Sequence, residues 1–71
     1  MISQNEQILK YLHEFGSITP REAYNELGIM RLAARIHDLR SMGVNIYTEE
    51  ITKPNRYGVK TRFARYSIKY E

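Results

Sequence analysis

The sequence predicts an α+β fold in which three short helices are followed by a two-stranded β-hairpin. Up to residue 42, apolar side chains recur every three or four positions, which is typical of amphipathic helices. After Gly43 they alternate with polar side chains, and this period of two is typical of half-buried strands. A chain of 71 residues is expected to form a single domain over residues 1–71 with one thin core.

The first helix is expected from about Asn5 to Phe15. Ser3 and Glu6 have the spacing of a capping box, which satisfies free backbone N–H groups at a helix start. Gly16 provides a stop signal. The predicted apolar face of this helix consists of Ile8, Leu9, Leu12 and Phe15.

The second helix is expected from about Pro20 to Glu26, after a short extended link at residues 17–18. Ile18 in this link points inward in our prediction and is placed to pair with a later strand. Thr19 suits the N-cap, Pro20 suits the first helical position, and Glu22 follows the cap by three residues. Gly28 ends the helix. Its predicted inward residues are Ala23 and Leu27, with Tyr24 beside them.

The third helix is expected from about Met30 to Met42. Its apolar residues are separated by three, four and three positions, which places them on one helical face. Arg40 lies in the last turn, where a cation interacts favourably with the helix dipole, and Gly43 closes the helix. The predicted buried stripe is Ile29, Leu32, Ile36 and Leu39.

A β-hairpin is expected after Gly43. Its first strand contains Val44, Ile46 and Thr48 on one face, and its second strand runs from Lys60 to about Lys69. Residues 52–58 contain Pro, Asn and Gly and are predicted to form a long turn. The second strand should place Ala64, Tyr66 and Ile68 on one face and Phe63, Arg65 and Ser67 on the other.

The positive charge is concentrated in the later part of the chain. The formal net charge is +3, of which residues 1–28 contribute −2, residues 29–48 contribute +2 and residues 49–71 contribute +3. A one-sided basic surface is expected of a protein that binds a polyanion. A surface that only keeps the protein soluble explains the same charge, so both interpretations stay open at this point.

Several function classes have no support in the residues. The chain has no cysteine, which excludes disulfides, thiolate zinc sites and thiol nucleophiles. His13 and His37 are expected on different helices, and no paired carboxylates or phosphate-binding glycine loop are present. We therefore expect no enzyme activity, no metal, no cofactor and no small-molecule substrate. No apolar run is long enough for a membrane span, and the polar start does not fit a signal peptide, so we expect a cytoplasmic protein with no membrane partner.

The order of elements and several segments resemble a winged helix-turn-helix. Gly16–Ala23 resembles the start of the helix-turn-helix, and Leu32–Arg40 resembles its recognition helix, followed by Gly43 and Ile46 at the first wing strand. The whole chain is similar to the short helix-turn-helix domains often encoded by phages and prophages, in which the segments Asn55–Gly58 and Phe63–Tyr66 recur. The resemblance implies a winged helix-turn-helix fold with a double-stranded DNA partner.

Three residues of the third helix are predicted to contact DNA. Ala34 lies opposite the buried stripe, where a small side chain lets the backbone approach a groove. Arg31 lies at the N-terminal end, which reaches base edges in this docking geometry, and Arg35 follows one turn later. The alternative for Arg35 is an ion pair with Asp38. Arg40 is expected to form polar contacts at the rim of the core.

The predicted wing is the second candidate contact. Between Ile51 and Phe63 there are four cations and no acid, and wings of this type place such side chains on the flanking backbone or in the minor groove, as the resemblance implies. At the start of the second helix, Thr19 and Arg21 form a candidate phosphate clamp. An ordinary solvated turn, and capping alone by Thr19, are the alternatives. The predicted wing contacts are Lys53, Asn55, Arg56, Tyr57, Lys60 and Arg62.

The aromatic side chains and the wider function complete the prediction. Tyr57 is expected to be exposed, and core-edge packing is expected for Tyr11, Tyr47, Tyr66 and Tyr70. The leading hypothesis is a phage-type double-stranded DNA-binding domain that regulates transcription, recombination or replication. The alternatives are a protein-interaction module of a phage assembly or replication complex, and a domain that binds structured RNA. The sequence leaves open whether the domain forms a homodimer.

Overall fold

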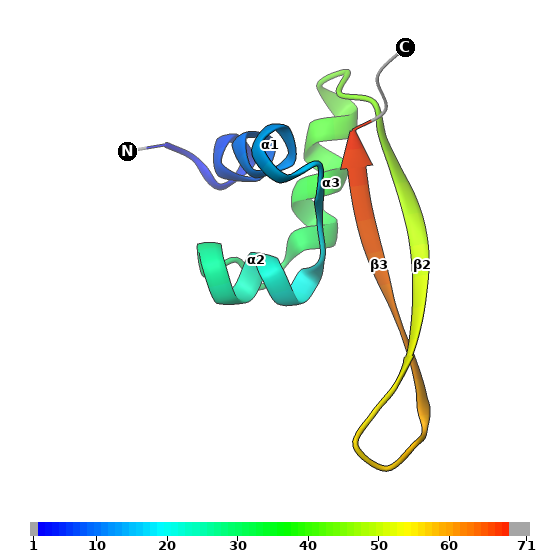
Figure 1. Cartoon of the computed structure of the whole chain (residues 1–71). Coiled ribbons are helices and arrows are strands. Elements are labelled where there is room, and N and C mark those ends of the chain that lie inside the picture. Colours follow the sequence, from blue (N-terminus) through cyan, green and yellow to red (C-terminus); the bar gives the residue numbers. More distant parts are fainter. Residues whose placement is uncertain (1, 69–71) are drawn as a thin grey trace.

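Three helices pack against a three-stranded antiparallel sheet, from which a long hairpin projects (Figure 1). The elements in chain order are α1 (Gln4–Phe15), β1 (Ser17–Ile18), α2 (Pro20–Leu27), α3 (Leu32–Ser41), β2 (Ile46–Pro54) and β3 (Lys60–Ile68). This computed structural model describes residues 2–68, so the expectations for Lys69 and Tyr70 lie outside the described residues. The α+β fold predicted from the sequence is confirmed.

The first helix begins one residue earlier than predicted and is capped at both ends. The Ser3 hydroxyl accepts a hydrogen bond from the Glu6 backbone N–H at 3.1 Å, and Gly16 ends the helix in the left-handed conformation with φ 87°. Ile8 and Leu12 are buried as expected. The prediction for Phe15 is wrong because its side chain is 60% exposed. Phe15 is the last helical residue, beyond the part of α1 that packs on the core.

The second helix and the short link before it follow the prediction closely. Ile18 is fully buried and pairs with Tyr66 of β3, so the link is a short third strand. Thr19 and Glu22 form a complete capping box, with distances of 3.2 Å and 2.9 Å between the paired atoms. Ala23 is fully buried, and Gly28 ends the helix with φ 68°.

The third helix begins at Leu32, two residues later than predicted. Ile29 is buried, but its backbone N–H donates to the Ala23 carbonyl and so closes the end of α2. Arg31 is the N-cap residue, with φ −112° and ψ 60° outside the helical region. Residues 29–31 therefore form a turn, because Gly28 directs the chain back onto α2 before α3 can start.

Strand β2 extends further than the sequence indicates, whereas β3 begins at Lys60 as predicted. β2 continues to Pro54, which pairs with Lys60, so only residues 55–59 connect the strands. A proline is tolerated there because β2 is an edge strand, in the sheet order β1-β3-β2. The expected core packing of Tyr47 is wrong: this side chain is 50% exposed, because it points to the opposite face from its buried neighbour Ile46.

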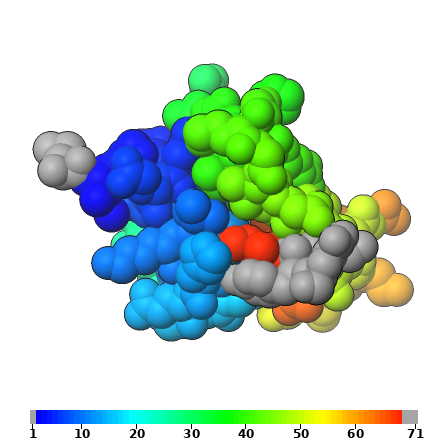
Figure 2. Space-filling model, turned by 90° about the horizontal axis from the view of Figure 1, so that it is seen from above, coloured from blue at the N-terminus to red at the C-terminus, as the bar shows by residue number. Residues whose placement is uncertain are grey.

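The hairpin tip is organised by the side chain of Asn55. The Asn55 Oδ1 atom accepts hydrogen bonds from the backbone N–H groups of Tyr57, at 2.9 Å, and Val59, at 3.1 Å. The Gly58 N–H donates to the Asn55 carbonyl, and Gly58 has φ 78°, where glycine is strongly favoured. The tip is therefore a defined turn, which extends past the helices in both whole-molecule views (Figures 1 and 2).

One core joins the helices to the inner face of the sheet. In β2 and β3, the buried residues Ile46 and Tyr66 lie on the face that meets the helices. At the edge of this core, the Tyr11 hydroxyl donates to the Glu26 carboxylate and so links α1 to α2. This hydrogen bond, followed by burial and by nearby carboxylates, raises the pKa of Tyr11 above its usual range. The core residues are Ile8, Tyr11, Leu12, Ile18, Ala23, Ile29, Leu32, Ile36, Leu39, Ile46 and Tyr66.

We expect Tyr11→Phe to lower the free energy of unfolding by about 1 kcal/mol, because one hydrogen bond between α1 and α2 is lost. The raised pKa means that the folded state holds the Tyr11 proton more tightly than the unfolded chain does. The stabilisation is therefore complete below about pH 10, the pKa of an unfolded tyrosine, and is lost as the pH rises above it. Urea unfolding at pH 7 and pH 11 tests this, and an equal effect of the substitution at both values would contradict it.

We expect Asn55→Ala to loosen the hairpin tip and leave the core intact, because the two backbone N–H groups lose their acceptor. Amide hydrogen exchange at Tyr57 and Val59 should become at least about tenfold faster, while exchange in α1 stays unchanged. Asn55→Asp keeps an acceptor oxygen at the same position and serves as the control. Unchanged exchange in Asn55→Ala would show that the side chain does not hold the turn.

Candidate nucleic-acid interface

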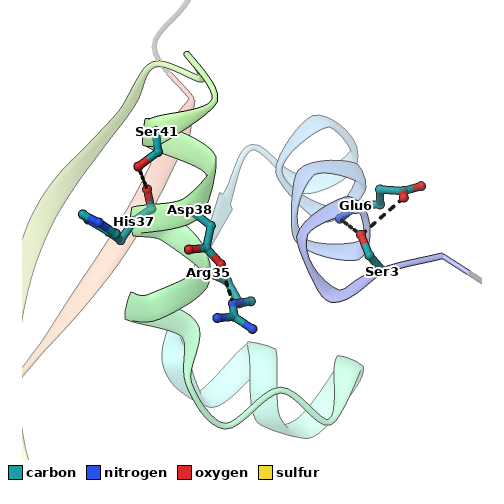
Figure 3. Close-up of polar contacts among 6 residues, drawn as sticks. All are labelled: Ser3, Glu6, Arg35, His37, Asp38 and Ser41. Atoms are coloured by element: carbon teal, nitrogen blue, oxygen red, sulfur yellow. Dashed lines mark hydrogen bonds and ion pairs between the residues drawn. The ribbon is translucent and has the colours of Figure 1, made fainter.

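The buried residues of α3 determine which side of the helix faces solvent. Leu32, Ile36 and Leu39 face the core, which turns the opposite side of the helix to solvent. His37 points toward the hairpin and Asp38 toward the side of α1 (Figure 3). Between these two side chains, the helix presents small residues such as Ala34, so its backbone is open to close approach.

Arg35 has the ion pair that the sequence offered as its alternative role. Its Nε atom lies 3.1 Å from Asp38 Oδ2, and its side chain is half-buried. The Nε–H is not aligned for a hydrogen bond with any described partner. Arg35 points down beside α1 and α2, on the far side of α3 from the hairpin (Figure 3). The carboxylate one turn later thus draws this arginine to the flank of the helix.

Arg31 and Ala34 lie together at the start of α3. They help to line a shallow hollow of about 330 Å³ between α2, α3 and β3. Arg31 is exposed, and within residues 2–68 no carboxylate forms an ion pair with it. Arg35 does not line this hollow, so the two arginines are not brought together. The hollow is lined by Pro20, Met30, Arg31, Leu32, Ala33, Ala34 and Tyr66.

A larger hollow lies between the start of α2 and the hairpin. It has a volume of about 690 Å³ and brings Thr19 and Arg21 close to Lys53 and Asn55. The Thr19 side chain already accepts the capping hydrogen bond of α2. Arg21 and Lys53 form no ion pair in the described part of the chain. Two unpaired cations from segments far apart in the sequence therefore line one hollow. The paired Arg65 and the capping carboxylate of Glu22 line it as well.

The hairpin tip carries the most exposed of the predicted contacts. Tyr57 is 82% exposed, as expected, and Arg56 and Lys60 are also exposed. Neither cation has a carboxylate partner among the residues that the structure describes. The side-chain Oδ1 atom of Asn55 accepts hydrogen bonds within the turn, so only the side-chain NH₂ group of Asn55 is left to bind another molecule.

The run of hairpin cations is less positive in space than in the sequence. Arg62 lies opposite Thr52 and forms an ion pair with Glu50, 3.6 Å away, and Arg65 is paired with Glu49. These pairs are not evident from the sequence because the acids precede the cations by twelve or more residues. Once the turn is placed at residues 55–59, the strand register follows from it. That register puts Arg62 opposite Thr52, two residues from Glu50 on the same face of the sheet.

Arg40 forms the polar contacts that were expected at the rim of the core. Its Nε and Nη2 atoms both donate to the Ile46 carbonyl, at 3.0 Å and 2.9 Å, and Nη2 also donates to Thr48 Oγ1 at 2.9 Å. The acceptors lie in β2, so this side chain joins the end of α3 to the base of the hairpin. The sequence predicted the contact but gave no sign of its partners.

The arrangement is suited to binding an anion with several spaced charges. Five cations have no ion-pair partner in residues 2–68 and are presented by the hairpin and by the starts of α2 and α3. The described residues contain no cluster of three His, Asp or Glu side chains that could hold a metal, and no helix among them could cross a membrane. On this surface the unpaired cations are Arg21, Arg31, Lys53, Arg56 and Lys60. Lys10 on α1 and Arg40, which donates to β2, also form no ion pair in the described residues but are not counted in this surface.

Comparison with known proteins agrees with this geometry. No curated protein sequence matches the chain. A protein family described as "Winged helix-turn-helix domain" matches residues 3–71. The winged helix-turn-helix is a DNA-binding fold. The match covers nearly the whole chain and agrees with the observed order of helices and strands, so the chain belongs to the winged helix-turn-helix domain family.

Proposed function

We propose that this domain binds double-stranded DNA with the start of α3 in the major groove and the hairpin on the flanking backbone or minor groove. The observation that carries the proposal is the placement of the five unpaired cations around two neighbouring hollows and the hairpin tip. Pro20 lines both hollows, so they adjoin at the start of α2, while opposite faces of β3 contribute Tyr66 to one hollow and Phe63 to the other. Phosphates spaced along a duplex match such separated cations.

The predicted contacts divide by what each side chain can reach. Arg31 lies before the first turn of α3, where it can reach a base edge, and Ala34 allows the helix backbone to approach the groove. At the start of α2, Arg21 and the hydroxyl of Thr19 are placed for phosphate contacts. At the wing, Lys53, Arg56 and Lys60 supply the charge, with the Asn55 amide and the Tyr57 hydroxyl beside them.

Arg35 and Arg62 are weaker candidates than the other cations. Each is paired with a carboxylate, Asp38 or Glu50, and must leave or share that partner to bind a phosphate. A solvent-accessible ion pair contributes less than about 1 kcal/mol, so a phosphate can replace the carboxylate. The loss of the ion pair then reduces the free energy gained from the phosphate contact. We therefore keep both in the proposed interface with smaller expected contributions.

The biological setting that we propose follows from the resemblance of the chain to phage-type domains. In this setting, a single domain over residues 1–71 acts in the cytoplasm of the host cell on transcription, recombination or replication. One such module neutralises few phosphates, so binding to paired sites or as a homodimer would raise its affinity.

A second candidate function is docking of a partner protein. The observation that favours it is the partly apolar lining of the larger hollow, where Pro20, Ile51 and Phe63 lie beside Arg21 and Lys53. Duplex DNA makes little use of apolar side chains in a backbone contact, whereas protein interfaces have apolar centres. Failure of the wild-type domain to bind any duplex at low salt would favour this second function.

The affinity for duplex DNA should depend steeply on salt. Five phosphate contacts predict a slope of about −4.5 in a plot of log K against log [salt], at about −0.9 per contact. Fluorescence anisotropy of a labelled mixed-sequence duplex, titrated at several salt concentrations, measures this slope. A slope near −1, or no binding at low salt, would contradict the proposed interface.

Charge reversal separates the interface from the rest of the surface. We expect Arg31→Glu and Arg56→Glu each to weaken duplex binding at least about tenfold, because an attraction to phosphate becomes a repulsion. Lys10→Glu makes the same change of charge on the exposed side of α1 and is the matched control, with less than about threefold loss expected. Equal losses in all three variants would mean that only the net charge matters.

A further inference from the structure

Arg40 connects the recognition helix to the hairpin by a forked contact. Its planar guanidinium donates from two nitrogens to the Ile46 carbonyl, the first residue of β2, and reaches Thr48 Oγ1 two residues further along. Arg40 itself lies in the last turn of α3. One side chain thus fixes two points on β2 relative to the end of the helix.

The Ile46 carbonyl that accepts these hydrogen bonds belongs to an edge strand of the sheet. β2 pairs with β3 on one side only, because the sheet order is β1-β3-β2. The contact is partly buried, and a carbonyl that is partly withdrawn from water needs a donor. Arg40 supplies that donor from the helix, where in a larger sheet a further strand would supply it.

The length of the hairpin makes this junction important. β2 contains nine residues, which extend about 26 Å at about 3.3 Å per step, so a rotation of about 10° at Ile46 moves the tip by about 5 Å. Helix packing holds the hairpin near Ile46 and Tyr66, which are buried, whereas residues 52–62 are exposed. The position of Arg56 at the tip therefore depends on the orientation of the hairpin at its base.

We propose that Arg40 is a positioning residue that sets the direction of the hairpin relative to α3 and so aligns the hairpin cations with Arg31 on one ligand. Arg40 acts through β2, to which its Nε and Nη2 atoms donate, and is not itself proposed as a ligand contact. The consequence for DNA rests on the proposed function, whereas the consequence for hairpin direction holds for the free protein.

The proposed role requires an arginine. A lysine keeps the positive charge but has a single ammonium group, which cannot make the two converging hydrogen bonds to the Ile46 carbonyl and reach Thr48 in the same geometry. Arg40→Lys therefore removes the fork and leaves the net charge unchanged, which separates positioning from simple attraction to phosphate.

The first experiment measures duplex affinity in a double-mutant cycle. We expect Arg40→Lys to weaken binding of a mixed-sequence duplex about tenfold and to make the salt slope shallower, because the misaligned hairpin cations meet fewer phosphates. In a background with Arg56→Ala and Lys60→Ala, the same substitution should cost less than about twofold, because there is little hairpin charge left to align. An equal loss in both backgrounds would overturn the inference, since damage to α3 would act without the hairpin cations.

The second experiment uses the free protein and no DNA. Residual dipolar couplings of backbone amides give the direction of the hairpin relative to α3, and we expect this direction to change or become averaged in Arg40→Lys. Thr48→Val removes one acceptor only and should produce a smaller change, which gives a second test if Arg40→Lys folds poorly. Couplings that fit the wild-type structure in both variants would overturn the inference, whether or not the domain binds DNA.

Discussion

The antiparallel register of β2 against β3 is the constraint on which the rest of the molecule depends. It pairs Ile46 with Ile68 and Thr48 with Tyr66, and this places the apolar members of these two pairs on the face that meets the helices. A slip of one residue would turn that set of side chains to solvent. The same register decides which cations are neutralised, because it brings Glu50 to Arg62. Fold and charge pattern therefore follow from one set of strand pairs.

The helices and the first strand were predictable because local signals agree with the core. At α2, the capping box of Thr19 and Glu22 and the left-handed Gly28 fix both ends, and the structure places them as predicted. The start of α3 was not predictable from apolar spacing alone, since Ile29 fits the helical stripe but belongs to the turn that closes α2. This shift matters for the site because it makes Arg31 an N-cap residue.

The candidate site was predictable by residue type and less so by arrangement. Exposed cations at Arg56 and Lys60 follow from turn chemistry, since a polar hairpin tip cannot be buried. Long-range pairing is invisible in a local pattern, so the ion pair of Arg62 and the β2 contacts of Arg40 emerge only in three dimensions. The spacing of Arg31 and Arg35 is compatible with both side chains contacting DNA from the same side of α3. In the structure, the ion pair with Asp38 holds Arg35 on the flank of α3 that lies away from the hairpin. Neutralisation thus leaves unpaired cations at the hairpin tip and at the starts of α2 and α3.

The central claim is that the hairpin and the starts of α2 and α3 act as one surface. An amide chemical-shift titration of the labelled domain with mixed-sequence duplex DNA at low salt tests it most directly. The account predicts that shifts gather in residues 19–21, 31–34 and 53–60 and change together along one binding curve. Shifts confined to α1, shifts of the hairpin and of α3 that follow different curves, or no shifts at all would contradict it.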